Sequence, residues 1–431
     1  MGLATLPTEL VETIASHLSL PDFRCFRLTS PPLNRQSLQL FRSRFFRRRS
    51  ITWTTEDLRC LLDISWHPDF GLALHDLVVD ATPKYAIQLW DLKNKMYESR
   101  HDSGLKTLYW MEYDLLNEKA DNSFRYWNET RHDQQTLTAI FQRLKQINSI
   151  TFCYDGVHRW YGFGNHKDKY CESSQNEMSR PFVSTLAAIA ASGILVHELS
   201  VHKERNHGAI SVGRLESISP LLPRLDCALE TLSALKLDLR DWRRPTEGFE
   251  PPPGKLPIAV RILSRCRNLR KLELSWFSTL ERNMFTQAVK HCHLTTLEVC
   301  RLELLHVNLE DLMAFLGPSK KNLRDLSLTH VVLRDVDSQW PELLRRFATE
   351  LHLQRLSFMS VFSHTSENVA FLDSTSEPPW FGIQFSGPKI REKLLEHAET
   401  LVIGDWGAPW HHASTAYPFE NHHRPPIKIV E

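Results

Sequence analysis

Cysteine and histidine are the side chains most able to do chemistry here, because both ligate metals and a cysteine thiolate is a nucleophile. The eight cysteines are scattered, and no two have the Cys-x-x-Cys spacing of a zinc or redox motif. His291, Cys292 and His293 are adjacent, but neighbouring residues at a helix end cannot all face one ion. A structural role explains these three residues better, and we predict no metal site.

Motifs for binding nucleotides or for hydrolysis give no stronger signal. Residues 162–164 form a lone Gly-x-Gly without the strand, helix and acidic residue of a dinucleotide site. The sequence contains no Gly-x-Ser-x-Gly, His-Glu-x-x-His or phosphate-loop motif. We therefore expect a protein that is not an enzyme and needs no cofactor. The alternative is an enzyme whose site lies in the insertions described below.

Arginine and phenylalanine alternate in residues 41–50, FRSRFFRRRS, a composition that can bind nucleic acid or direct nuclear import. The whole chain has 52 basic and 51 acidic residues, so no general basic excess supports nucleic-acid binding. The segment also lies where an N-terminal helical region joins the rest of the chain. We expect Phe41, Phe45 and Phe46 to pack there and the arginines to be solvated, with no nucleic-acid partner.

Length and composition indicate an ordinary folded protein. The 431 residues exceed the size at which one compact core stops growing, so a small domain and a larger body are expected. The sequence has no signal-peptide pattern and no run of apolar residues long enough to cross a membrane. We expect no membrane association and a cytoplasmic or nuclear location.

The N-terminal residues predict helices with a wide apolar side. Pro7 suits a first helical turn, and Leu10, Ile14 and Leu18 then recur every four residues. Ser19 or Leu20 can cap a second helix that begins with Pro-Asp, and a third helix is predicted from about residue 33 to residue 41. Three short helices form too small a unit to bury all this apolar surface, so something else must cover part of it.

Residues 6–41, LPTELVETIASHLSLPDFRCFRLTSPPLNRQSLQLF, resemble the F-box, and we assign residues 1–46 to such a domain. The resemblance implies docking to a Skp-type adaptor, which joins cullin and RING subunits in an SCF ubiquitin ligase. It also implies that the adaptor is contacted by Leu6, Pro7, Leu10, Ile14, Leu18, Leu20, Phe23 and Phe26. Pro31-Pro32 departs from the usual turn and leaves the start of the third helix open.

The body, residues 47–410, alternates short apolar runs with amphipathic segments, which is typical of β-α units. Strands are predicted near residues 75–80, 148–153, 197–202, 233–238, 270–275, 295–300, 324–329, 354–359 and 399–404. Helices are predicted at residues 55–65, 135–147, 182–192, 257–266, 308–316, 341–351 and 389–398. The sequence thus favours an α/β fold with a parallel sheet.

Four of the predicted strands carry the pattern Leu-x-x-Leu-x-apolar, as in Leu269, Leu272 and Leu274. The middle leucines are taken as residues 272, 297, 326 and 356, so the spacings are 25, 29 and 30 residues. This pattern resembles leucine-rich repeats, with irregular spacing and insertions. The resemblance implies a solenoid whose curved parallel sheet has the helices on its convex side.

Alternate strand residues point to opposite sides of a sheet, so the polar residues between the leucines should line the concave surface. Six of these are candidate contacts for a bound protein: Lys236, Asp238, Glu273, Glu298, Asp325 and Arg355. Exposure to solvent alone would also require polar residues at these positions. Only a minority of them should therefore contact a ligand.

Two long segments are predicted to be insertions, near residues 155–180 and 241–257. The first contains Trp160 and Tyr161, and long aromatic loops either recognise ligands or lack fixed structure. Residues 411–431 are predicted to be a frayed tail.

Together, these features predict the substrate-recognition subunit of an SCF-type ubiquitin ligase, with an unidentified protein as its target. The alternative is a leucine-rich-repeat interaction scaffold that acts outside any ubiquitin ligase.

Overall fold

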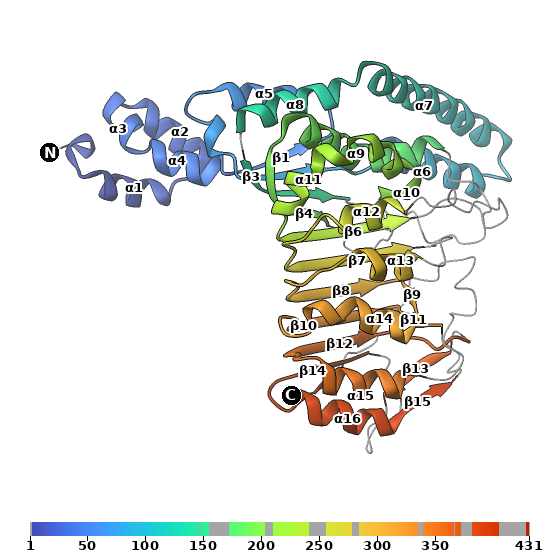
Figure 1. Cartoon of the computed structure of the whole chain (residues 1–431). Coiled ribbons are helices and arrows are strands. Elements are labelled where there is room, and N and C mark those ends of the chain that lie inside the picture. Colours follow the sequence, from blue (N-terminus) through green and yellow to red (C-terminus); the bar gives the residue numbers. More distant parts are fainter. Residues whose placement is uncertain are drawn as a thin grey trace.

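The computed structural model describes residues 2–144, 146–154, 172–202, 210–240, 256–277, 284–334, 339–365, 367–371, 382–404 and 428–430. Short N-terminal helices project from one end of a tall sheet, and further helices run along one side of that sheet (Figure 1). The chain is therefore an α/β protein with a large, mostly parallel sheet, in agreement with the fold class predicted from the alternating pattern.

The N-terminal unit contains four helices where the sequence predicted three. They are α1 (Thr8–Ser16), α2 (Leu20–Leu28), α3 (Pro31–Gln36) and α4 (Leu38–Phe45). Ser19 caps α2 as predicted, by accepting a 3.4 Å hydrogen bond from the Asp22 N–H. The predicted third helix is wrong, because Ser37 leaves helical geometry and its hydroxyl donates to the Leu33 carbonyl at 2.6 Å.

Pro31 and Pro32 form the start of helix α3 and do not interrupt a helix. Pro31 takes the first position of α3, where a missing N–H costs nothing, and Ser30 caps it through the Leu33 N–H at 3.4 Å.

The described part of the chain contains one sheet of 12 strands in the order β1-β2-β3-β4-β6-β7-β8-β10-β12-β14-β16, with β5 beside β6. The strands are β1 (Arg48–Thr52), β2 (Asp76–Asp80), β3 (Gln146–Cys153), β4 (Leu195–His202), β5 (Ile210–Ser211), β6 (Ala234–Arg240), β7 (Lys271–Phe277), β8 (Val299–Glu303), β10 (Asp325–Thr329), β12 (Arg355–Met359), β14 (Gly382–Ser386) and β16 (Lys428–Val430). Neighbouring strands are parallel except β12 and β14.

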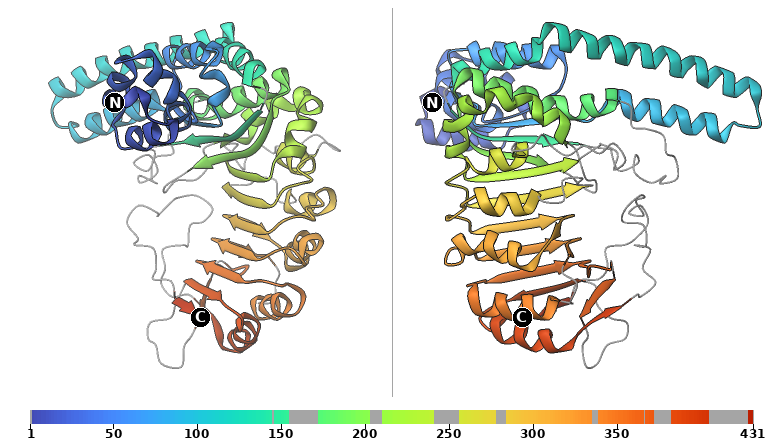
Figure 2. Two further views of the ribbon diagram at one scale, coloured as in Figure 1. Left: turned by 90° about the vertical axis from the view of Figure 1, so that its left-hand side faces the viewer. Right: turned by 45° about the vertical axis from the view of Figure 1, so that its right-hand side comes forward.

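Helices connect these strands and cover one side of the sheet, which curves away from them (Figure 2). They are α5 (Thr55–Trp66), α8 (His132–Leu144), α9 (Glu172–Ser192), α10 (Val212–Leu215), α11 (Leu222–Thr231), α12 (Ile258–Leu263), α13 (Met284–His291), α14 (Leu309–Leu316), α15 (Trp340–Glu350) and α16 (Ile390–Thr400). Leu272, Leu326 and Leu356 point toward these helices and are fully buried. The core therefore lies between the sheet and its helices, as alternation along the strands predicts.

One helical hairpin does not follow this plan. Helices α6 (Lys84–Glu98) and α7 (Ser103–Thr130) form a long arm between β2 and β3, and the arm extends beyond the sheet (Figure 2). Neither segment is among the helices that the sequence pattern predicts. The arm contacts the body at its base, where the start of α6 and the end of α7 both pack on α9.

The repeat frame predicted for the unit around residue 297 is wrong by three residues. In the sheet, Leu272 pairs with Cys300 and Leu274 with Leu302, and the same two β8 residues pair with β10. Cys300 therefore occupies the position that was assigned to Leu297. The equivalent residues Leu272, Cys300, Leu326 and Leu356 lie 28, 26 and 30 residues apart.

The last predicted strand also has a different place. Residues 399–404 contribute β15 (Leu401–Gly404), which pairs with β13 (Asn368–Phe371) in a separate antiparallel sheet. A second small sheet joins β9 (His306–Val307) to β11 (Val332–Leu333). Among the described residues, no helix combines the length and apolar character needed to span a membrane.

Candidate functional site

The N-terminal unit is built around a cluster of phenylalanines. The Phe23 ring lies 5.4 Å from that of Phe41 and 5.6 Å from that of Phe45, between ring centroids. Phe70 from the body stacks on Phe46 at 4.2 Å, so the cluster continues into the rest of the molecule. These contacts confirm that the phenylalanines of residues 41–50 pack at the junction.

Phe23 is fully buried in this cluster, so the predicted adaptor contact through its side chain does not fit the structure. Leu18, Leu20 and Phe26 are half-buried against the same cluster. The sequence missed this distinction because a short helix with apolar residues on several sides does not show which side packs inward.

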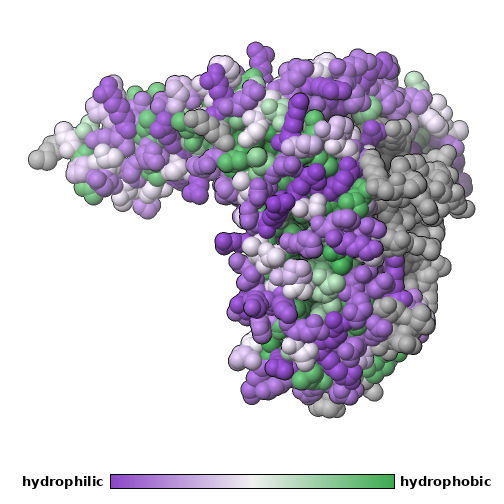
Figure 3. Space-filling view, in the orientation of Figure 1, coloured by the Kyte–Doolittle hydropathy of each residue, from purple (hydrophilic) through white to green (hydrophobic). Residues whose placement is uncertain are grey.

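Leu10 and Ile14 point away from the cluster and remain 51% and 41% exposed. They lie one turn apart on α1, while Val11 and Ala15, about 100° further around that helix, are buried. Pro7 is exposed and Leu6 is half-buried. Figure 3 shows hydrophobic residues at the surface of this projecting unit, interspersed with hydrophilic ones.

Three side chains hold α1 in place and so fix the direction in which Leu10 and Ile14 point. The Gln36 amide donates to the Leu6 carbonyl at 3.0 Å, and Glu12 accepts from the Leu40 N–H at 3.2 Å. Arg44 donates to the Ser16 carbonyl at 2.6 Å. These bonds connect α1 to α3 and α4, so the exposed apolar surface is presented by a fixed scaffold.

The sequence predicts that the arginines of residues 41–50 are solvated, but in the structure several of them bond to other parts of the chain. Besides Arg44, Arg42 forms a 3.1 Å ion pair with Asp69 and Arg47 a weaker 3.9 Å pair with Asp76. Arg48 and Arg49 begin β1 at the edge of the large sheet. The segment therefore connects the N-terminal unit to the body.

On the polar side of the sheet, Glu273 gathers three cations. Its carboxylate lies 3.0 Å from Lys236 Nζ, 3.0 Å from Lys271 Nζ and 3.3 Å from Arg301 Nη1. Burial of the Glu273 carboxyl tends to raise its pKa, but Lys236 and Lys271 outweigh burial and hold the pKa below its usual value. Lys236 and Glu273 are directly opposed on β6 and β7.

Asp325 and Arg355 form a second pair, at 3.5 Å, on β10 and β12. The structure thus brings the predicted residues of this surface into two groups of ion pairs. Charged groups of a bound protein could interact with these side chains. Each carboxylate and each cation, however, already has a partner of opposite charge within the surface.

Two residues predicted for the polar surface are not part of its accessible area as predicted. Asp238 lies on the same side of β6 as Lys236, but it is only 1% exposed and is not available to a partner. Glu298 lies just before β8, and the residues of β8 that face Glu273 and Ser327 are those around Arg301. The error in the repeat frame caused the second misplacement. Trp160 and Tyr161 lie outside the described residues.

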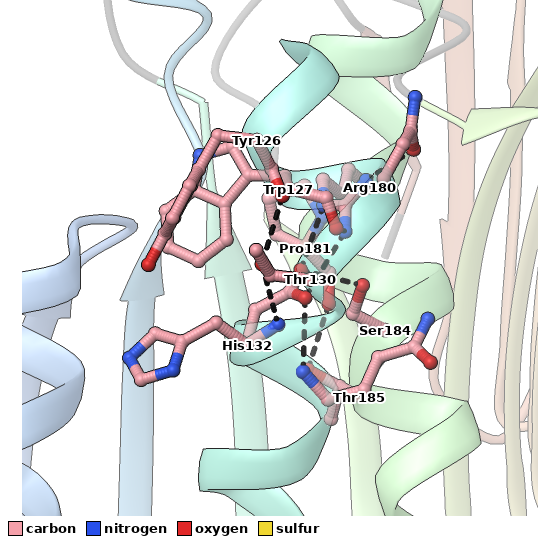
Figure 4. A network of polar contacts seen from close by, with 11 residues as sticks. Tyr126, Trp127, Thr130, His132, Arg180, Pro181, Ser184 and Thr185 are labelled. Carbon is pink, nitrogen blue, oxygen red and sulfur yellow. Dashed lines mark hydrogen bonds and ion pairs between the residues drawn. The ribbon is translucent and has the colours of Figure 1, made fainter. Parts of the chain in front are cut away.

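A buried polar network that no sequence motif predicts lies at the base of the α6–α7 arm. Asp133 is fully buried, and its carboxylate accepts hydrogen bonds from Arg180 at 2.7 and 3.0 Å and from Ser184 at 2.8 Å. Arg180 also donates to the Trp127 carbonyl, near the end of α7 (Figure 4). Arg180 thus connects α9 both to Asp133 of α8, 47 positions away, and to the end of α7, 53 positions away at Trp127. Residues this far apart share no local sequence pattern.

Possible metal ligands do not gather in the described part of the chain. No group of three or more His, Cys, Asp or Glu side chains there is placed to hold a metal ion. Cys292 is buried while His291 and His293 are exposed, so these adjacent residues point in different directions.

No protein-family model matches the chain, and no curated protein matches it significantly.

Proposed function

We propose that this protein is a substrate-recognition adaptor of an SCF-type ubiquitin ligase. Its N-terminal unit would be an F-box that docks a Skp-type adaptor, and its body would be an irregular leucine-rich-repeat solenoid that binds a target protein. The observation that carries the proposal is the exposed Leu10 and Ile14 pair on α1, within a sequence that resembles the F-box.

The geometry supports docking through this pair. A unit with its own phenylalanine core projects from the body, and its exposed leucine and isoleucine are held by bonds from α3 and α4 (Figure 1). Buried apolar anchors supply most of the energy of stable protein interfaces. Leu10 and Ile14 could provide such anchors, with Pro7 beside them, while Phe23 would shape the surface from beneath.

The proposed role requires no chemistry from this chain. Holding a target near a loaded conjugating enzyme replaces a bimolecular encounter by an effectively intramolecular one. The polar sheet surface, with ion pairs around Glu273 and between Asp325 and Arg355, is the candidate region for the target. The strands that form it lie in the body, away from α1 in the projecting unit (Figure 1), which would let both partners bind together.

Co-expression with a Skp-type adaptor tests the proposal. The two proteins should co-purify and elute together in gel filtration. The double variant L10D/I14D should lose the adaptor, because each substitution places a charge in the apolar interface. L72D is the matched control, since Leu72 is 71% exposed on the short helix η2 (Gly71–Ala73), outside the N-terminal unit. Co-purification that survives L10D/I14D would defeat the proposal.

A further inference from the structure

Helix α7 has one side that packs and one that does not. Of the described helices it is the longest, at 28 residues, and none of its residues is fully buried. Tyr109 and Tyr113 face α6, where they meet Lys95 at 5.9 Å and Lys93 at 5.6 Å. This side of α7 is therefore already in use within the arm.

A second stripe on α7 is apolar and faces solvent. It consists of Leu105, Leu108, Met111 and Leu115, which are 45%, 61%, 66% and 54% exposed. Their spacing of three and four residues places them along one side of the helix. Leu105 lies one turn from Tyr109 at the edge of this stripe, while Leu108, Met111 and Leu115 face away from both tyrosines. Helix propensity alone does not explain them, because alanine, lysine or glutamate would serve as well without exposing apolar surface.

Acidic side chains flank this α7 stripe. Glu112 follows Leu108 by four residues, and Asp114 and Glu118 follow Met111 and Leu115 by three, so each lies beside the stripe. None of these three carboxylates forms an ion pair with another described residue. Lys119 is the single cation at a comparable position. Three carboxylates against one lysine leave the edges of the stripe with a net negative charge.

We propose that the α7 stripe is a docking surface for a basic amphipathic helix of a partner protein. The apolar side of such a helix would cover Leu108, Met111 and Leu115, with lysines or arginines along its edges opposite the carboxylates. The four side chains fall well short of the roughly 800 Å² per partner of a standard interface, so the complex is weak and transient.

Charge argues for this occupant over two others. An anionic membrane would be repelled by Glu112, Asp114 and Glu118. A second copy of this chain would bring its own carboxylates to the same edge. The inference rests on the α6–α7 arm alone and does not depend on the adaptor role of the N-terminal unit.

A model peptide tests the proposal with the full chain. The probe is a fluorescein-labelled helical peptide of leucine and lysine, with leucines at spacings of three and four. The control peptide replaces every lysine with glutamate. Fluorescence anisotropy should show that the lysine peptide binds at least about tenfold more tightly than the glutamate peptide, and less tightly as salt is added.

Three variants locate the binding. L108Q/M111Q/L115Q keeps good helix formers and should weaken lysine-peptide binding at least about tenfold. E112Q/D114N/E118Q should weaken it and reduce its dependence on salt. L72Q removes an exposed leucine elsewhere and should change nothing. Circular dichroism should show all three variants folded, because the substituted side chains are exposed.

Several results would overturn the inference. These are no binding of the lysine peptide, equal binding of the glutamate peptide, or binding that L108Q/M111Q/L115Q leaves unchanged. Co-sedimentation with phosphatidylserine vesicles that this variant abolishes would replace the partner helix by a lipid surface. A dimer seen by light scattering and lost in the same variant would replace it by a second copy.

Discussion

Arg180 Nε lies 2.7 Å from Asp133 Oδ2, and this ion pair joins helix α8, which follows the α6–α7 arm, to helix α9. The Asp133 side chain is fully buried and that of Arg180 is 13% exposed. Ser184 and the Gln134 N–H also donate to Asp133, and Arg180 also donates to Asn128 Oδ1 and the Trp127 carbonyl. Loss of one partner from such a pair costs more than replacement of both by apolar side chains, because the remaining charge stays buried.

The substitution D133A should lower the free energy of unfolding by about 3 to 5 kcal/mol, because it leaves the Arg180 guanidinium without its carboxylate. The double variant D133L/R180M, which removes both charges, should lose less. Urea denaturation followed by circular dichroism measures both. A larger loss in the double variant than in D133A would contradict the role assigned to the pair.

Glu177 should make stability depend on pH. Burial raises the pKa of its carboxyl to about 7, although hydrogen bonds from the Tyr85 and Ala86 N–H groups act in the opposite direction. Because the folded protein binds this proton more tightly than the unfolded chain does, the contribution to stability is fully present below the unfolded pKa of about 4.3. It is lost as the pH rises through about 7.

The substitution E177Q should remove this contribution. Between pH 5 and pH 8, wild type should lose on the order of 2 kcal/mol relative to E177Q, as measured by urea denaturation at a series of pH values. Parallel curves for the two proteins would show that the carboxyl does not titrate in this range.

The corrected repeat frame predicts different effects for two residues of β8. Leu302 is 1% exposed and Val299 is half-buried on the polar side of the sheet. L302A should cost about 2 to 5 kcal/mol through lost burial and a cavity, while V299A should cost less than about 1 kcal/mol. Chemical denaturation compares them, and the reverse order would restore the frame predicted from the sequence.

In the N-terminal unit, substitution of a buried and of an exposed apolar residue should affect the free energy of unfolding very differently. F23A should lower the free energy of unfolding by about 3 to 5 kcal/mol, because Phe23 is fully buried among Phe41 and Phe45. L10A should change it by no more than about 0.5 kcal/mol, since Leu10 is half exposed. Limited proteolysis near residue 46 reports on this unit alone. Equal sensitivity of the two variants would place Leu10 in the core.

The sequence predicted the parts of this fold that repeat. Alternating leucines marked β6, β7, β10 and β12, and the amphipathic segments marked α14, α15 and α16. The prediction failed where the apolar residues fit two alternative repeat frames, as in residues 297–302. Only the pairing of Leu302 with Leu274 and Leu328 in the sheet decides between these frames.

Tertiary relationships escaped the sequence for a different reason. Nothing local distinguishes the buried Phe23 from the exposed Leu10, because both are apolar residues on short helices and only the position of Phe41 decides between them. The same holds for Asp133, whose burial depends on an arginine from another helix. The α6–α7 arm was missed because its apolar residues lie on two sides and give no single clear period.

The central claim is that Leu10 and Ile14 anchor a Skp-type adaptor, and the most direct test is the dissociation constant for that adaptor in purified form. Biolayer interferometry should give equal affinity for wild type and L72D. L10D/I14D, with an unchanged urea midpoint, should bind at least about a hundredfold more weakly, as expected for the loss of two central anchors. Equal affinity of L10D/I14D and wild type, or no binding by wild type, would contradict the account.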